Sequence, residues 1–253
     1  MSGFSKERAL IAVALLAGAC AGPTHRVHPE AASRWEGLRT VGVVQPAVPV
    51  YELDASGNLE EKPDWTEAAE NNLAQAIASE LTVRGVKPFS VVSSMETEPE
   101  LVDAMLLFEA VTRDVLFANY VVPFVTPHSG FRYSLGDLSS LARSYDVDGF
   151  VFAVGQGQNS SGGRTASEVA KTVVGALLAI LSGGGGAYEP QFGVDWLAIG
   201  LVDARGDLLW FGVYDSGGGD LRSLSSATNL TRAATHEMPV KAPGPQALPK
   251  GGP

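Results

Sequence analysis

The stretch Val147-Asp-Gly-Phe-Val-Phe-Ala-Val154 constrains the fold of this chain most strongly. Apart from Asp148 it contains only apolar residues and one glycine, so it lacks the polar alternation of a strand with one solvent-exposed face. A nearly continuous apolar strand is typical of the centre of a sheet that is covered on both faces. We therefore expect a sheet with helices packed against it.

The segments around this strand alternate between strand and helix patterns. Apolar residues recur at helical spacing over residues 65–84 and again over residues 98–120. Further strands are expected at residues 41–44, 48–53, 59–63 and 86–92, a short helix at residues 135–144 and a last helix at residues 221–236. Residues 194–203 and 207–214 alternate in polarity around Ala204-Arg-Gly206, which predicts a hairpin. The order predicts one layered α/β domain with a mixed sheet of about four to six strands, ending in a β-hairpin and then a helix.

The N-terminal segment carries the pattern of a secretory signal. Lys6 and Arg8 are basic, Ala9–Ala19 are eleven apolar or small residues, and Cys20 follows as the only cysteine of the chain. The apolar run is too short to span a hydrocarbon core of about 30 Å. With one cysteine the chain can form no internal disulfide, so its stability must come from its core.

The sequence Leu16-Ala-Gly-Ala-Cys20 resembles the lipobox of bacterial lipoproteins. The resemblance implies that residues 1–19 are a signal peptide and that Cys20 is lipidated and becomes the mature N-terminus. Ala21 after the cysteine, in place of Asp, implies sorting to the outer membrane. The alternative is an ordinary signal that is cleaved after Ala-Gly-Ala.

The chain then divides into three parts. Residues 20–39 are expected to be a lipidated flexible tether, because they contain Gly22, Pro23 and Pro29 and show no apolar period. Residues 40–237 are expected to form the α/β domain, and residues 238–253, rich in proline and glycine, a disordered tail. His25 and His28 make only a poor metal site on a flexible segment, so no metal and no cofactor are predicted.

The charge balance narrows the choice of partners. The chain has 18 basic and 28 acidic residues, for a net charge of −10. An acidic surface argues against nucleic acid, and against binding to anionic lipid by charge alone. Attachment to a membrane would therefore come from the lipid at Cys20.

Two polar stretches are candidates for chemical sites. A glycine-rich segment, residues 155–163, lies between a strand and a helix pattern, which is the arrangement that cradles phosphates. Its glycine spacing fits neither the dinucleotide fingerprint nor the P-loop, so a mobile loop, or a loop that orders against a partner, is expected. Asp215 and Asp220 flank a glycine turn, where Asp220 is expected to cap the last helix. With His236 they are the candidate residues of a hydrolase, but no complete catalytic set is present, so the prediction is no enzyme.

An unusually apolar helix is expected over residues 166–182. Its small residues recur at four-residue spacing, which lets helices approach closely. It is interpreted as a buried core helix, a contact for another subunit or partner, or a membrane-inserting element. The residues proposed for a partner or oligomer contact are Gly175, Leu177, Leu178, Ala179 and Gly183.

Two segments carry a wider resemblance. Ser144-Tyr-Asp-Val-Asp-Gly-Phe-Val-Phe152 and Leu201-Val-Asp-Ala-Arg-Gly-Asp-Leu-Leu-Trp210 are similar to the domain shared by CsgG-like lipoproteins, the N-terminal domain of TolB and LpoB-type activators. The resemblance spans about residues 40–236. It implies an envelope protein that binds partners or assembles into rings, without catalysis.

These observations predict a non-catalytic outer-membrane lipoprotein on the periplasmic side, which binds or positions envelope proteins or glycan. A self-assembling subunit of an envelope secretion or export complex, and so a homo-oligomer, is the first alternative. An uncharacterised periplasmic hydrolase that uses Asp215, Asp220 or His236 is the second.

Overall fold

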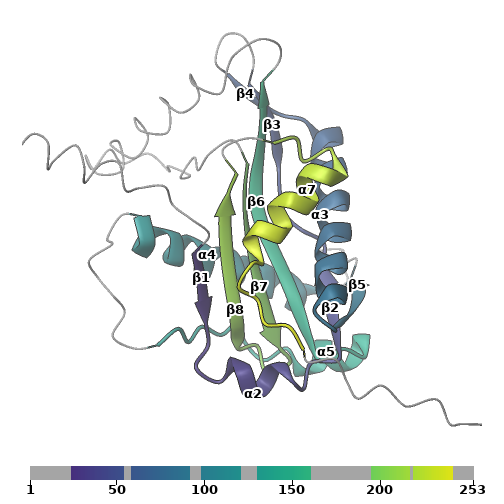
Figure 1. Ribbon diagram of the computed structural model, residues 1–253, viewed down its shortest axis with the longest axis vertical. Coiled ribbons are helices and arrows are strands. Elements are labelled where there is room, and N and C mark those ends of the chain that lie inside the picture. Colours follow the sequence, from purple (N-terminus) through teal and green to yellow (C-terminus); the bar gives the residue numbers. More distant parts are fainter. Residues whose placement is uncertain are drawn as a thin grey trace, which may run out of the picture.

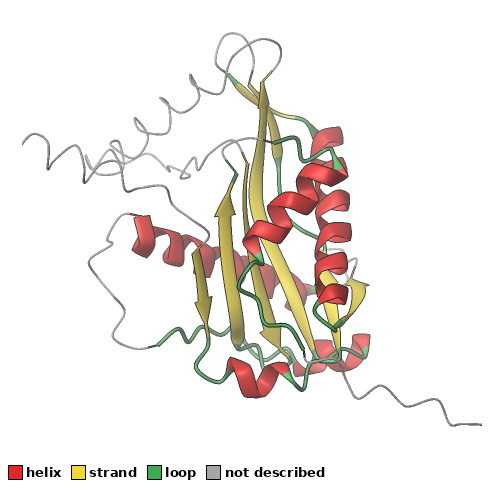
Figure 2. Ribbon diagram, in the orientation of Figure 1, coloured by secondary structure: helices red, strands yellow, loops and turns green. Residues whose placement is uncertain are grey.

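The computed structural model describes residues 24–53, 58–91, 98–120, 130–160, 195–216 and 219–241. These residues form one mixed β-sheet with helices on both faces (Figures 1 and 2). The predicted α/β class is confirmed. The sheet has eight strands and is therefore larger than the four to six that the sequence predicts.

The elements follow the predicted alternation with shifted boundaries. The strands are β1 (Thr24–Val27), β2 (Thr40–Val44), β3 (Val50–Leu53), β4 (Leu59–Glu61), β5 (Lys87–Val91), β6 (Gly149–Ser160), β7 (Asp195–Asp203) and β8 (Leu208–Asp215). The helices are α2 (Ala31–Trp35), α3 (Pro63–Val83), α4 (Pro99–Tyr120), α5 (Ser139–Tyr145) and α7 (Leu224–Ala234).

The main path of the sheet runs in the order β1-β8-β7-β6-β2-β5. Strands β5, β2 and β6 are parallel, whereas β6, β7, β8 and β1 pair antiparallel. Strand β3 joins the far end of β6 in parallel and pairs with β4. The apolar strand β6 thus lies inside the sheet, which confirms the predicted place of residues 147–154.

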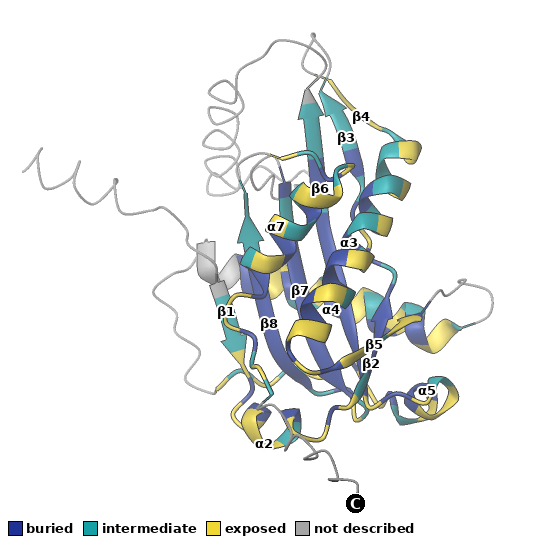
Figure 3. Cartoon of the chain, turned by 45° about the vertical axis from the view of Figure 1, so that its right-hand side comes forward, coloured by how far each residue is buried: buried dark blue, intermediate teal, exposed yellow. Residues whose placement is uncertain are grey.

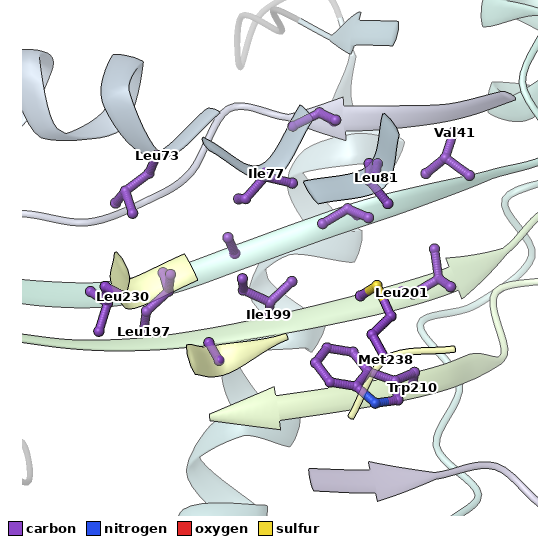
Figure 4. Packing of buried hydrophobic residues seen from close by; sticks show 14 of the residues in the cluster. Val41, Leu73, Ile77, Leu81, Leu197, Ile199, Leu201, Trp210, Leu230 and Met238 are labelled. Carbon is purple, nitrogen blue, oxygen red and sulfur yellow. The ribbon is translucent and has the colours of Figure 1, made fainter. Parts of the chain in front are cut away.

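Helices cover both faces of this sheet. Figure 1 shows α3 and α7 in front of it and α4 behind it. The front face buries side chains of α2, α3 and α7 against β6, β7 and β8, and the back face buries those of α4 and α5 (Figure 3). Figure 4 shows the front cluster, in which Trp210 of β8 is fully buried and Met238 packs beside it. Burial on both faces explains why β6 has no polar alternation.

The predicted loop at residues 155–163 is wrong for its first part, because β6 continues to Ser160. Gly155 and Gly157 stand opposite Leu197 and Asp195 in the β6–β7 ladder. A Cβ atom at position 155 would lie 2.3 Å from the carbonyl oxygen of Trp196. Glycine therefore marks a close backbone approach inside a strand here, and no phosphate-binding loop starts at these residues.

The predicted tether is also wrong from Thr24 onward. β1 pairs antiparallel with β8, and α2 packs its apolar face onto the front cluster. Ala31, Trp35 and Leu38 are each 3% exposed. Their spacing of four and three residues is helical, and it was the available signal that this stretch belongs to the fold.

The predicted tail likewise begins too early. Met238 is buried, the backbone N–H of Lys241 donates to the carbonyl oxygen of Arg84 at 3.1 Å, and the Lys241 ammonium donates to the carbonyl oxygen of Leu38. The folded domain therefore extends from Thr24 to Lys241, where the sequence predicted residues 40–237. Residues 242–253 lie outside the described part.

Arg34 fastens α2 to the turn between β7 and β8. Its guanidinium lies 2.5 Å from Asp207 and 3.1 Å from Asp203, and it also pairs with Glu30 at 2.6 Å. Asp203 accepts, in addition, the backbone N–H groups of Arg205 at 3.0 Å and Asp207 at 3.2 Å. Asp203, the last residue of the Leu-Val-Asp motif, thus stabilises the hairpin turn and also binds α2 through Arg34.

We expect Arg34→Met to lower the free energy of unfolding by about 1–3 kcal/mol, because it leaves the buried Asp203 and the partly exposed Asp207 without their nearest cation. The matched control is Arg205→Met. Arg205 meets the same Asp203 at 3.4 Å, but its side chain is 65% exposed, so the loss should stay below about 0.5 kcal/mol. Urea denaturation compares the two variants, and equal losses would contradict the role given to Arg34.

Candidate functional site

Some residues singled out in the sequence lie outside the described residues. They are Cys20 and the proposed contact residues Gly175, Leu177, Leu178, Ala179 and Gly183. The lipidation and the helix at residues 166–182 therefore stay predictions. Among the residues that the structure describes, no helix combines the length and the apolar character needed to cross a membrane.

Asp220 is engaged by a neighbouring arginine. The Arg222 guanidinium donates to its two carboxylate oxygens at 2.7 and 2.8 Å, and this holds the pKa of Asp220 below its usual value. The same guanidinium lies 4.0 Å from the centre of the Trp65 ring. The predicted capping role is wrong, because the residue that precedes α7 as its N-cap is Ser223. The carbonyl oxygen of Asp220 instead accepts the backbone N–H of Ser223 at 2.8 Å, in the turn before α7.

His236 lies beyond the other end of α7. The eleven residues of that helix rise by about 16 Å, so the helix separates His236 from Asp220. The His236 side chain is 70% exposed and lies 3.6 Å from Glu237. The structure therefore does not bring Asp220 and His236 together.

The two N-terminal histidines do not form a metal site either. His28 is buried, and its Nδ1 accepts the backbone N–H of Glu30 at 3.1 Å. Within the described ranges no group of three or more His, Cys, Asp or Glu side chains is placed to hold a metal ion.

The most unusual polar residue of the described chain begins β7 and is not among the predicted site residues. Asp195 is the first residue of β7 and is 1% exposed. One carboxylate oxygen, Oδ1, accepts the backbone N–H of Gln158 at 3.2 Å, whereas Oδ2 is buried without a hydrogen-bond partner. A Cβ atom on Gly219 would lie 2.7 Å from Oδ2, so only glycine lets the β8–α7 connection pass this close.

This environment raises the pKa of Asp195 to about 7. Burial is the main cause, because the charged carboxylate loses its hydration. The negative charges of Asp220 and Asp215 act in the same direction, and the hydrogen bond from Gln158 opposes them. A carboxyl group that titrates near neutrality is typical of a functional position, since a purely structural site rarely keeps a buried charge unpaired.

Asp195 borders a small polar pocket between the end of the sheet and α7. The pocket has a volume of about 210 Å³. Its polar lining residues are Asp195, Tyr214, Ser216, Ser226 and Asn229. None of the described lining residues is His, Cys or Lys. Hydroxyl, amide and carboxyl groups of this kind suit hydrogen bonding to a small polar group of a ligand.

The sequence did contain a signal for Asp195. In β7 it shares its face with Leu197, Ile199 and Leu201, all of which are fully buried in the front cluster. The period of two therefore places a carboxylate on the buried face of a strand. Only the structure shows that Asp215 and Asp220 lie near enough to affect its pKa.

Comparisons with known proteins leave the family open. No protein-family model matches the chain, and no curated protein matches its sequence. Among solved structures, a PelC variant dodecamer from Paraburkholderia phytofirmans is similar over 84% of this chain and 94% of that chain, with 17% sequence identity and a TM-score of 0.37. A likeness this distant carries no argument about the function of this chain.

Proposed function

We propose that this chain is a non-catalytic lipoprotein of the outer membrane whose domain faces the periplasm and binds other envelope components. One observation carries the proposal: the only cysteine of the chain ends an apolar segment that follows two basic residues. A signal segment of this kind directs export. A sole thiol at its end is the expected acceptor of lipid.

The composition fits this location. The chain has no second cysteine, so an oxidising compartment leaves it without a disulfide to form or to lose. A net charge of −10 provides no general attraction to anionic lipid, so the acyl chains at Cys20 would supply the attachment.

Binding is preferred to catalysis because of how the candidate residues are arranged. Asp220 is paired with Arg222, and His236 is exposed at the far end of α7. The pocket beside Asp195 offers hydroxyl, amide and carboxyl groups that suit a glycan or a peptide. This is the chemistry of recognition.

Cys20→Ser tests the anchor. We expect this variant to lose acylation and to leave the membrane fraction, appearing in the soluble periplasmic fraction with its domain folded. Ala21→Asp is the matched control, because it keeps the cysteine and is expected to move the acylated protein to the inner membrane. A Cys20→Ser protein that still fractionates with the outer membrane would contradict the proposal.

Self-assembly remains the second candidate function. The main path of the sheet ends in β1 and β5, and edge strands offer backbone groups for pairing with another copy. Sedimentation velocity of the chain without residues 1–20, over a range of concentrations and with detergent, tests it. A monomer under every condition would reject this candidate.

A further inference from the structure

The link between the proposed lipid anchor and the folded domain is very short. Only Ala21, Gly22 and Pro23 separate Cys20 from Thr24, the first residue of β1. Four Cα–Cα steps of 3.8 Å or less reach at most about 15 Å. The longer tether expected from the sequence would have reached roughly 60 Å, enough for the domain to stand clear of the bilayer.

The chain is held to the sheet from Thr24 onward, so residues after Thr24 add no length to the linker. All four residues of β1 pair with β8, and the backbone N–H of His28 donates to the carbonyl oxygen of Leu209 at 2.9 Å. Buried Trp35 and the ion pairs of Arg34 then hold α2 to the same region. A lipid on Cys20 is therefore attached, through three residues, to one particular edge of the sheet.

That edge carries cations in an acidic chain. We define the β1 edge by His25, Arg26, Val27 and Arg132. Arg132 is exposed and lies close enough to Glu30 to lower the pKa of that carboxyl, although the Arg34 hydrogen bond lowers it more. The loop that carries Arg132 passes close to the residues that follow β1, since a Cβ on Gly130 would lie 3.2 Å from the Pro29 side chain. Basic side chains near a bilayer are attracted by anionic headgroups.

We infer that the β1 edge of the domain lies against the phospholipid surface and that the β5 edge points away from it. This inference rests on the proposed lipid anchor. Figure 1 shows β1 and β5 at opposite ends of the main sheet path. Five strand steps of about 4.8 Å separate them by about 24 Å. A spacer that reaches about 15 Å from Thr24 holds the first edge near the headgroups and leaves the second in the periplasm.

Two matched positions allow a direct test. Val27 on β1 is 43% exposed and Phe89 on β5 is 42% exposed. Once Cys20 carries its lipid, a cysteine at either position is the only free thiol of the chain. The acylated Val27→Cys and Phe89→Cys proteins are labelled with a fluorophore and reconstituted into vesicles of phosphatidylethanolamine and phosphatidylglycerol that contain a headgroup-attached quencher.

We expect quenching at position 27 to exceed that at position 89 several-fold. A flexible Gly/Ser insertion of about 20 residues after Ala21, which adds roughly 25 Å of reach, should bring the two positions close to equal. Arg26→Glu combined with Arg132→Glu should lower quenching at position 27 without releasing the protein from the vesicles.

The possible failures can be told apart. Equal or reversed quenching in a protein that is acylated and bound to vesicles would overturn the orientation and leave the proposed anchor intact. Absence of acyl mass on the protein, with both labels unquenched, would overturn the anchor and the orientation together. A label at position 27 that is unquenched and shielded in a sedimenting oligomer would show instead that the β1 edge contacts a second copy.

Discussion

A chain that begins at Thr40 should be much less stable than one that begins at Thr24. The truncation removes β1 and α2, so it exposes the edge of β8 and uncovers the cluster that contains Trp210. Loss of the buried Trp35 side chain alone is expected to cost about 3–5 kcal/mol, out of a total of about 5–15 kcal/mol for a typical domain. Urea denaturation of the two chains measures the difference.

A single substitution covers the case in which the short chain does not fold. Trp35→Ala in the longer chain should lower the free energy of unfolding by about 3–5 kcal/mol. Val83→Ala is the control, because Val83 is 72% exposed and its truncation should change stability by less than about 0.5 kcal/mol. If the chain that begins at Thr40 were as stable as the longer one, residues 24–39 would be a tether after all.

Asp195 should make the stability of the domain fall as the pH rises from about 4 to about 7. The folded state raises the pKa of this carboxyl from 3.8 to about 7, so between these values the native state binds a proton that the unfolded state has released. Below this window both states are protonated, and above it both are charged, so the full cost of burying the charge is felt above pH 7. The shift corresponds to about 4 kcal/mol.

Asp195→Asn removes this dependence. The Asn oxygen still accepts the N–H of Gln158, but its amide nitrogen takes the place of Oδ2 and finds no partner, which costs about 1–3 kcal/mol. We therefore expect the variant to be about 1–3 kcal/mol more stable than the parent at pH 8, and no more stable than the parent at pH 4.

Asp103→Asn on the exposed face of α4 is the control, and it should leave stability within about 0.5 kcal/mol at both pH values. Stability curves of the three proteins at pH 4, 6 and 8 would reveal the crossing. An Asp195→Asn effect that is independent of pH would contradict the raised pKa.

Periodicity in the sequence predicted the elements whose buried residues form a regular apolar pattern along the chain. The β7–β8 hairpin, the central strand and the helices α3 and α4 all follow apolar patterns of period two, continuous runs or period 3.6, and the structure contains each of them. The predicted ends of elements differ from the observed ends where a residue type fits both a loop and a strand. Gly155 and Gly157 predicted a loop, although their role is a close backbone approach within β6.

The elements that the sequence missed depend on distant partners. β1 has four residues and no apolar period, and it is a strand because β8 offers it an edge. α2 has only five residues, and it is held by Asp203 and Asp207, far away in the chain. Short elements of this kind gain their stability from tertiary contacts more than from propensity, and the helical spacing of Ala31, Trp35 and Leu38 is the one local signal that this stretch carries.

The candidate functional residues also fall into those that a contiguous stretch of sequence indicates and those that depend on distant contacts. Cys20 was predicted from a contiguous stretch, because a signal segment and a cysteine are readable in order along the chain. The raised pKa of Asp195 needed the structure, because it depends on burial and on two carboxylates, Asp215 at the end of β8 and Asp220 in the β8–α7 connection. Of the candidate hydrolase residues, Asp220 and His236 lie beyond opposite ends of α7, and their residue types alone did not reveal this separation.

The most direct test of the central claim is the intact mass and N-terminal peptide of the mature protein isolated from outer membranes. The account predicts a chain that begins at Cys20, with the mass of an acylated cysteine, followed by Ala21. A mature chain that begins at Ala21 or later, or a Cys20 that still carries a free thiol, would contradict it.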